Sequence, residues 1–148
     1  MSKVYSDVGV SVDGFLAGPR QSRTDPLGEG GEQLHRWMFE TGDESRTERE
    51  AIVDAGAFIM GRNMFGPVRG EWDEDWRGWW GEEPPYHAPV YVLTRFPREP
   101  VIMEGGTTFH FVTEGIESAL KQARAAAGGR NVSIAGGAST VNQYLAAG

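Results

Sequence analysis

An uninterrupted apolar run near the middle of the chain does most to limit the possible folds. Ala57-Phe58-Ile59-Met60 leads directly into Gly61-Arg62. A strand without a polar face must be covered on both sides, so this run is predicted to lie inside a sheet, followed by a short helical turn at residues 63–65. Gly61 would let a ligand approach the backbone, and the Arg62 guanidinium suits phosphate. Taken alone, the stretch favours a plain core strand that ends in a surface arginine.

Strands and helices are predicted to alternate along the rest of the chain. The predicted strands are 3–12, 57–60, 90–93, 107–112 and 132–135. The predicted helices are a short one from Leu34 to about Gly42, then 44–55 capped by Gly56, 114–127 capped by Thr113 and closed by Gly128, and 138–147. This alternation predicts an α/β fold with a mostly parallel central sheet and flanking helices, in a single domain over residues 1–148.

Two segments are predicted to be irregular. Residues 18–33 are polar and rich in glycine, and loops of this length often act as lids or binding loops. Residues 66–89 hold four of the five tryptophans, Trp72, Trp76, Trp79 and Trp80. So many large rings are expected to cover a core edge, a ligand or a second subunit.

The composition excludes several classes of function. A net charge of −7 argues against binding to nucleic acid or to an anionic membrane. The chain has no cysteine, which excludes disulfides, thiolate metal sites and a cysteine nucleophile, and we expect a cytoplasmic protein. The three histidines, His35, His87 and His110, lack metal-ligand spacing, so no metal site is predicted. The chain also lacks the Gly-Lys-Ser/Thr of a P-loop.

Three of the predicted strands end in residues that suit a nucleotide. Gly61-Arg62, Thr94-Arg95 and Gly136-Gly137 each follow a strand directly. In a parallel sheet these carboxyl ends lie at the same edge, where ligands bind. Two glycines at the start of a helix can expose their amides to a pyrophosphate, and an arginine can hold the extra phosphate of NADP. The combination predicts a nucleotide site, although each pair alone is weak.

Four motifs in this order resemble the dihydrofolate reductase-like superfamily. They are Ser11-Val12-Asp13-Gly14-Phe15-Leu16-Ala17, Gly56-Ala57-Phe58-Ile59-Met60-Gly61-Arg62, Val92-Leu93-Thr94-Arg95 and Ile134-Ala135-Gly136-Gly137-Ala138. The branch most similar to this chain is the C-terminal reductase domain of the bifunctional riboflavin-biosynthesis deaminase/reductase. The resemblance covers nearly the whole chain and implies NADPH as cofactor, a small-molecule substrate and often a homodimer.

The resemblance also implies roles for individual residues. Gly61 and Arg62 would meet the cofactor phosphates, and Thr94 and Arg95 would hold its adenosine end. Gly136, Gly137 and Ala138 would lie along the pyrophosphate. Asp13, Gly14 and Phe15 would border the nicotinamide and the substrate, with Asp13 as the candidate catalytic residue, and Trp37 would lie near the pocket mouth or the dimer contact. An Asp-Gly turn needs no further purpose, so a structural role for Asp13 stays open.

The chain departs from this pattern in two ways. Members of the family continue past the position of Gly148 to form the last strands of the sheet. Either a partner supplies that edge here or the chain is truncated at its C-terminus, and we expect truncation. Dihydrofolate reductase uses a carboxylate on its first long helix, and Glu40, Glu44, Glu48 and Asp54 match its position poorly. The expected activity is therefore reduction of a ribosylamino-pyrimidine or a similar small heterocyclic or sugar-linked compound. The alternatives are a dihydrofolate or pterin reductase, and a nucleotide-binding relative without turnover.

Overall fold

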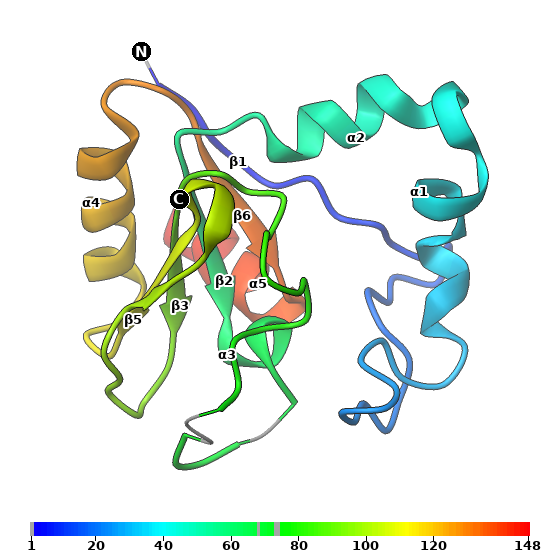
Figure 1. Ribbon diagram of the computed structural model, residues 1–148, viewed down its shortest axis with the longest axis horizontal. Coiled ribbons are helices and arrows are strands. Elements are labelled where there is room, and N and C mark those ends of the chain that lie inside the picture. The colour runs from blue at the N-terminus through cyan, green and yellow to red at the C-terminus, as the bar shows by residue number, and fades with distance from the viewer. Residues whose placement is uncertain (1, 68, 73–74) are drawn as a thin grey trace.

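The computed structural model describes residues 2–67, 69–72 and 75–148 (Figure 1). In this part of the chain six strands form one sheet in the order β1-β6-β2-β3-β5-β4. All neighbouring strands are parallel except β4 and β5, which are antiparallel. The strands are β1 (Val4–Tyr5), β2 (Ala57–Gly61), β3 (Pro89–Leu93), β4 (Val101–Ile102), β5 (Thr108–Val112) and β6 (Val132–Gly136). The predicted mostly parallel α/β fold is confirmed.

Helices α4 (Ile116–Ala127) and α5 (Ala138–Ala147) cover one face of the sheet. Successive side chains of a strand point to opposite faces, so Ala57 and Ile59 of β2 contact this helical layer. Ala119 and Ala123 of α4 are fully buried against the strands. Small alanine side chains let the helix backbone approach the sheet closely, and this explains why the face of α4 is built from them.

The opposite face is covered mainly by aromatic side chains. Phe58 and Met60 of β2 point to this side, and Phe65 of the short helix α3 (Arg62–Phe65) is fully buried there. Trp72, Trp76 and Trp80 pack against the same core cluster. The expected irregular segment before β3 thus covers a core edge, one of the three predicted roles, although positions 68, 73 and 74 of that segment lie outside the described residues.

The predicted first strand at residues 3–12 is wrong in its length. β1 contains only Val4 and Tyr5, which pair with Val132 and Ser133 of β6. At the next position the Ser6 hydroxyl donates to the Ile134 carbonyl (2.7 Å). Val10 and Val12 are exposed by 54% and 111%, so their alternation with polar residues reflects no buried face. The valine pattern predicts a longer strand, but the chain leaves the sheet after Tyr5.

Two predicted helix caps are also wrong. Helix α2 (Arg46–Val53) ends at Asp54, and Gly56 instead lies against the end of α4, where an added Cβ would stand 2.8 Å from the Ala127 carbonyl oxygen. Gly56 is therefore required by close packing. Helix α4 begins after Gly115, whose φ of 94° favours glycine, and not after Thr113. The Thr113 amide donates a hydrogen bond to the Glu114 carboxylate (2.9 Å). The Gly128 cap is confirmed, with φ of 58°.

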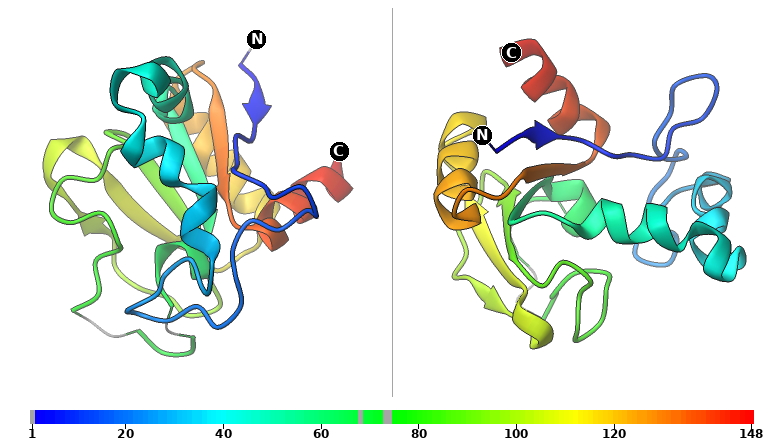
Figure 2. Two further views of the ribbon diagram at one scale, coloured as in Figure 1. Left: turned by 90° about the vertical axis from the view of Figure 1, so that its right-hand side faces the viewer. Right: turned by 90° about the horizontal axis from the view of Figure 1, so that it is seen from above.

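A helical segment projects from the β1 side of the sheet, away from α4 (Figures 1 and 2). It comprises α1 (Arg36–Glu40), α2 and the 3₁₀ turns Gly31–Leu34 and Gly42–Ser45; a third 3₁₀ turn, Glu104–Gly106, precedes β5. Arg49 of α2 donates to the Met38 carbonyl of α1 (3.3 Å), and the Tyr5 hydroxyl donates to the Asp54 carbonyl at the end of α2 (3.1 Å). These bonds hold the segment together and tie it to β1.

Candidate functional site

The predicted strand ends meet at one edge of the sheet. The pairing of β2 with β3 sets Gly61 beside Leu93, and the pairing of β2 with β6 sets Met60 beside Gly136. The residues that follow these strands, Arg62, Thr94 and Gly137, therefore start from neighbouring positions. The sheet brings together groups that lie up to about half the chain apart, as parallel topology requires.

Arg62 joins the first two strand ends directly. Its Nη1 donates to the Thr94 hydroxyl oxygen (3.2 Å). The same hydroxyl oxygen accepts the Phe96 amide (3.1 Å), which fixes the turn after β3. Arg95, between them, is exposed and extends from this fixed turn. The arginine that follows β2 and the polar turn that follows β3 thus form one connected unit.

The Arg62 guanidinium is partly desolvated. Its carbon lies 3.3 Å from the centre of the Trp72 ring, and that of Arg98 lies 5.2 Å from the same ring. Burial, and secondly the charge of Arg98, lower the pKa of Arg62 below its ordinary value. Within the described part of the chain, the buried Nε of Arg62 has no hydrogen-bond partner. Two neighbouring cations and an unused buried donor fit an anionic ligand.

The third strand end packs tightly against the first. An added Cβ at Gly61 would stand 2.5 Å from the Thr140 hydroxyl of α5, and one at Gly136 would stand 3.2 Å from the Met64 sulfur of α3. Gly136 has φ of 135°, and its peptide bond to Gly137 is cis. Gly137 is the N-cap of α5, and an added Cβ there would have open space around it. The backbone at the start of α5 is accordingly accessible to a ligand.

The family model of the RibD C-terminal domain matches residues 2–148. The chain belongs to this family. A comparison with curated proteins finds no significant match. The RibD C-terminal domain is a reductase domain, which assigns the chain to the oxidoreductases at that coarse level. The resemblance drawn from the four motifs is thereby confirmed, and so is the fold that it implied.

The substrate-side residues proposed for this RibD C-terminal domain lie in a compact exposed turn. Asp13 accepts a hydrogen bond from the Ser11 hydroxyl (2.5 Å), and the same hydroxyl oxygen accepts the Phe15 amide (2.9 Å). Gly14 has φ of 90°, as the turn requires, and Phe15 is 62% exposed. These bonds account for the turn by themselves. Within the described residues Asp13 makes no hydrogen bond or ion pair with Arg62, Thr94 or Gly136, so its catalytic role stays a prediction.

Trp37 lies in α1, on the projecting helical segment and not at the strand ends. Its carbonyl accepts the Thr41 hydroxyl, and its side chain is half-buried. The structure thus brings together the predicted cofactor-side residues, Gly61, Arg62, Thr94, Gly136 and Gly137, but leaves Asp13, Gly14, Phe15 and Trp37 in separate elements.

Sequence reasoning missed two residues of this site. Trp72 stacks on Arg62, and Thr140 fills the space beside Gly61. Trp72 stood in the tryptophan-rich segment, but an irregular segment has no period from which a contact could be inferred. Thr140 lies near the start of α5. Its contact with Gly61 depends on how closely α5 packs against β2, and the sequence does not give that distance.

Among the described residues, no cluster of three or more His, Asp or Glu side chains is placed to hold a metal ion. None of the described helices has both the length and the apolar character needed to cross a membrane.

Proposed function

We propose that this protein is an NADPH-dependent reductase of a small heterocyclic or sugar-linked substrate. The observation that carries the proposal is the hydrogen bond from Arg62 to Thr94, made at the carboxyl ends of two parallel strands and beside the open start of α5. Family membership supports reductase chemistry, and the three adjacent strand ends support a dinucleotide as the ligand.

The residues present fit this cofactor. Arg62 offers a buried Nε that has no hydrogen-bond partner in the described part of the chain, and Arg95 is exposed in a turn that Thr94 fixes. At the start of α5 the backbone of Gly137 is open, since an added Cβ there would meet nothing within 4 Å, and Ala138 beside it is exposed. When bound, NADPH supplies the hydride. The protein's part is to hold the dinucleotide, to orient the ring that reacts, and to admit the substrate on the side of Asp13, Gly14 and Phe15.

A preference for NADPH over NADH follows from the charge at the second strand end. Arg62, Arg95 and Arg98 all lie close in sequence or space to Thr94, in a chain whose net charge is −7. An extra phosphate on the cofactor would be attracted to this cluster, whereas the hydroxyl of NADH would gain little. We therefore propose that selectivity is decided here.

The substrate class is proposed from the family. The riboflavin-pathway type of reductase acts on 5-amino-6-(5-phosphoribosylamino)uracil and converts the ribosyl group to its ribityl form.

A homodimer is likewise proposed from the family. Ile102 on the edge strand β4 and Leu145 on α5 are both 74% exposed, and either surface could contribute to a dimer contact. Light scattering on the purified protein measures the assembly directly.

The first test titrates the protein with NADPH and with NADH and uses tryptophan fluorescence to measure binding. The second test measures NADPH consumption with a panel of ribosylamino-pyrimidines and pterins. We expect selective NADPH binding and turnover with the ribosylamino-pyrimidine. Binding without turnover on the full panel would favour a relative without catalysis, and turnover with pterins alone would favour a pterin reductase. A protein that binds neither cofactor would refute the proposal.

A further inference from the structure

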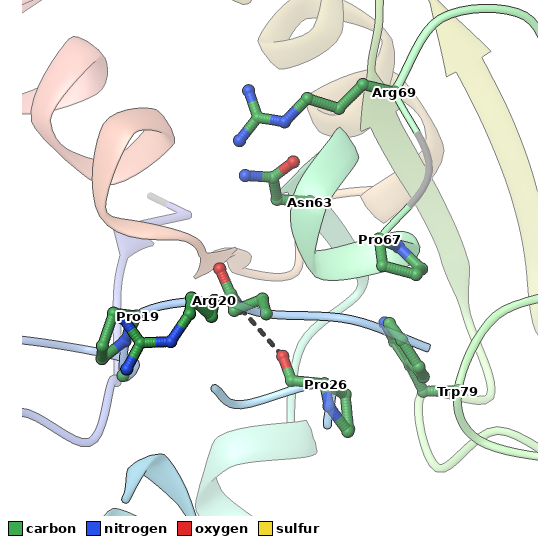
Figure 3. A pocket seen from close by; sticks show the side chains of 9 residues that line it. Pro19, Arg20, Pro26, Asn63, Pro67, Arg69 and Trp79 are labelled. Carbon is green, nitrogen blue, oxygen red and sulfur yellow. Dashed lines mark hydrogen bonds between the residues drawn. The ribbon is translucent and has the colours of Figure 1, made fainter. Parts of the chain in front are cut away.

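A small polar pocket lies between the glycine-rich loop and helix α3. It has a cavity volume of about 250 Å³ and is lined by residues of both segments (Figure 3). The loop contributes Gly18, Pro19, Arg20, Gln21 and Pro26, and the other wall contributes Asn63, Pro67, Arg69 and Trp79. Asn63 directly follows Arg62 on α3, so one wall of the pocket and the proposed cofactor site share this short helix.

The loop side of the pocket is rigidly built. The Gly18 amide donates to the Leu27 carbonyl (2.7 Å), and the Glu29 amide donates to the Pro19 carbonyl (2.9 Å). The Gln21 side-chain amide donates to the Pro26 carbonyl (2.8 Å), the bond drawn in Figure 3. The two limbs of the loop lie so close that an added Cβ at Gly18 would stand 2.0 Å from the Glu29 carbonyl oxygen. Such a loop can serve as a fixed wall.

The loop is also docked onto the tryptophan-rich segment. The Arg23 guanidinium carbon lies 5.4 Å from the centre of the Trp76 ring. Trp76 is itself fixed, because its indole nitrogen donates to the Phe65 carbonyl (2.9 Å). Trp79 packs edge-on against Trp76, with the ring centres 4.6 Å apart. The Trp79 side chain that lines the pocket is therefore held in place by its neighbour.

The charge in the pocket is positive. Among the described residues that line it, none is acidic and two are arginines. Arg20, with φ of 56°, is bound to Glu29, and Figure 3 shows its guanidinium beside Pro19, away from Arg69. Arg69 makes no ion pair within the described residues. The polar ends of Arg69 and Asn63 point the same way in Figure 3. Among the described residues, the pocket thus offers the Arg69 cation and the Asn63 amide to a ligand, in a chain of net charge −7.

We propose that this pocket binds the substrate's anionic group and ring, with Arg69 pairing with the anion, Asn63 donating to it, and Trp79 and Pro67 holding the ring. The substrate class is a single-ring compound that carries a carboxylate or phosphate. This inference rests on the proposed function, since the ligand is the compound to be reduced. A polar pocket of this size admits one ring, and a lining that holds both the cation of Arg69 and the indole of Trp79 favours an anionic ring over a neutral one.

The test compares two probes that differ only by a carboxylate, orotate and uracil, by calorimetric titration of the full-length protein. We expect orotate to bind at least about tenfold more tightly than uracil, because only orotate can pair with Arg69. The variant R69Q should lose about tenfold in orotate affinity and leave uracil unchanged. R124Q removes the same charge from the exposed face of α4 and should change neither.

A second pair of variants tests the ring contact. W79F keeps an aromatic face and should retain most of the orotate affinity, whereas W79A should lose several-fold, with folding checked by thermal unfolding. Orotate that fails to bind, orotate and uracil that bind equally, or an R69Q protein with wild-type affinity would each overturn the proposal.

Titration of NADPH on the same samples separates the two proposals. Unchanged NADPH affinity in R69Q is expected, because the cofactor is assigned to Arg62, Thr94 and Arg95. An R69Q variant that loses NADPH and orotate affinity equally would assign the pocket to the cofactor and overturn the substrate site. A wild-type protein that binds orotate but not NADPH would leave the anion pocket standing and refute the reductase.

Discussion

The guanidinium carbon of Arg62 lies 3.3 Å from the centre of the Trp72 ring. Trp72 is in turn fixed by a hydrogen bond from its indole nitrogen to the Phe96 carbonyl (2.7 Å) and by edge-on contacts with Phe65 and Phe111. Arg62 is thus held on one side by an aromatic face and on the other by the Thr94 hydroxyl. A long flexible side chain held in this way loses little further freedom on binding a phosphate.

Trp72→Leu should weaken NADPH binding, because it removes the surface on which Arg62 lies. A cation–π contact is worth roughly 0.5–2 kcal/mol, so the expected loss is from a few-fold to about thirtyfold. Trp72→Phe keeps a ring and should recover most of the affinity. Fluorescence of the reduced nicotinamide measures both. The prediction fails if the Leu and Phe variants lose NADPH affinity equally at matched thermal stability.

Arg95→Glu should separate the two cofactors. Loss of a charge-assisted hydrogen bond and addition of a repelling carboxylate should weaken NADPH binding by more than about tenfold, and NADH binding by much less. Paired titrations of both cofactors on the wild type and the variant measure the ratio. Equal losses for NADPH and NADH would show that Arg95 does not contact the extra phosphate.

Gly61→Ala should destabilise the junction between β2 and α5. The backbone φ at Gly61 is −79°, which alanine adopts readily, so the cost comes only from the added Cβ, 2.5 Å from the Thr140 hydroxyl. Overpacking of this kind costs roughly 1–3 kcal/mol of unfolding free energy. Urea unfolding of the single variant measures it.

The double variant Gly61→Ala/Thr140→Ala provides the control for that steric explanation. Removing the Thr140 hydroxyl leaves its Cβ 3.8 Å away, at ordinary contact distance. The double variant should therefore recover most of the stability lost in the single variant, a coupling that a double-mutant cycle reports. Purely additive losses would indicate that Gly61 is required for another reason.

His110 should make the stability depend on pH. Its ring stacks on Tyr91, with the centres 5.1 Å apart, and burial lowers the pKa of His110 below its ordinary 6.5. The unfolded chain then takes up the proton first as the pH falls. The stability that His110 contributes is present above that ordinary pKa and is lost as the pH drops through the lowered value.

His110→Phe keeps the stacked ring and removes the titration. Thermal unfolding at about pH 8 and about pH 5 should show a smaller loss of melting temperature in the variant than in the wild type. Identical losses would indicate that the pH dependence comes from other groups.

Much of the fold was predictable because local patterns decided it. The apolar run Ala57–Met60, the start of α5 at Ala138 and the left-handed Gly128 after α4 all match the prediction. The same reasoning extended the first strand too far, to residue 12. Val10 and Val12 alternate with polar residues, but such alternation indicates a half-buried strand only where a partner strand and a core are present. Pairing is a tertiary property that one segment does not contain.

The same distinction between local and tertiary information applies to the candidate site. The amino-acid sequence by itself determined the parallel α/β sheet and the chemical groups at its strand ends, since a buried strand and the glycine or arginine after it are local features. Only the tertiary structure decided that Trp72 holds Arg62, that Thr140 requires glycine at position 61, and that the loop at residues 18–26 forms a pocket with Arg69 and Trp79. These contacts join irregular or distant segments. Which groups meet there is decided by side-chain packing, because such segments have no repeating sequence pattern.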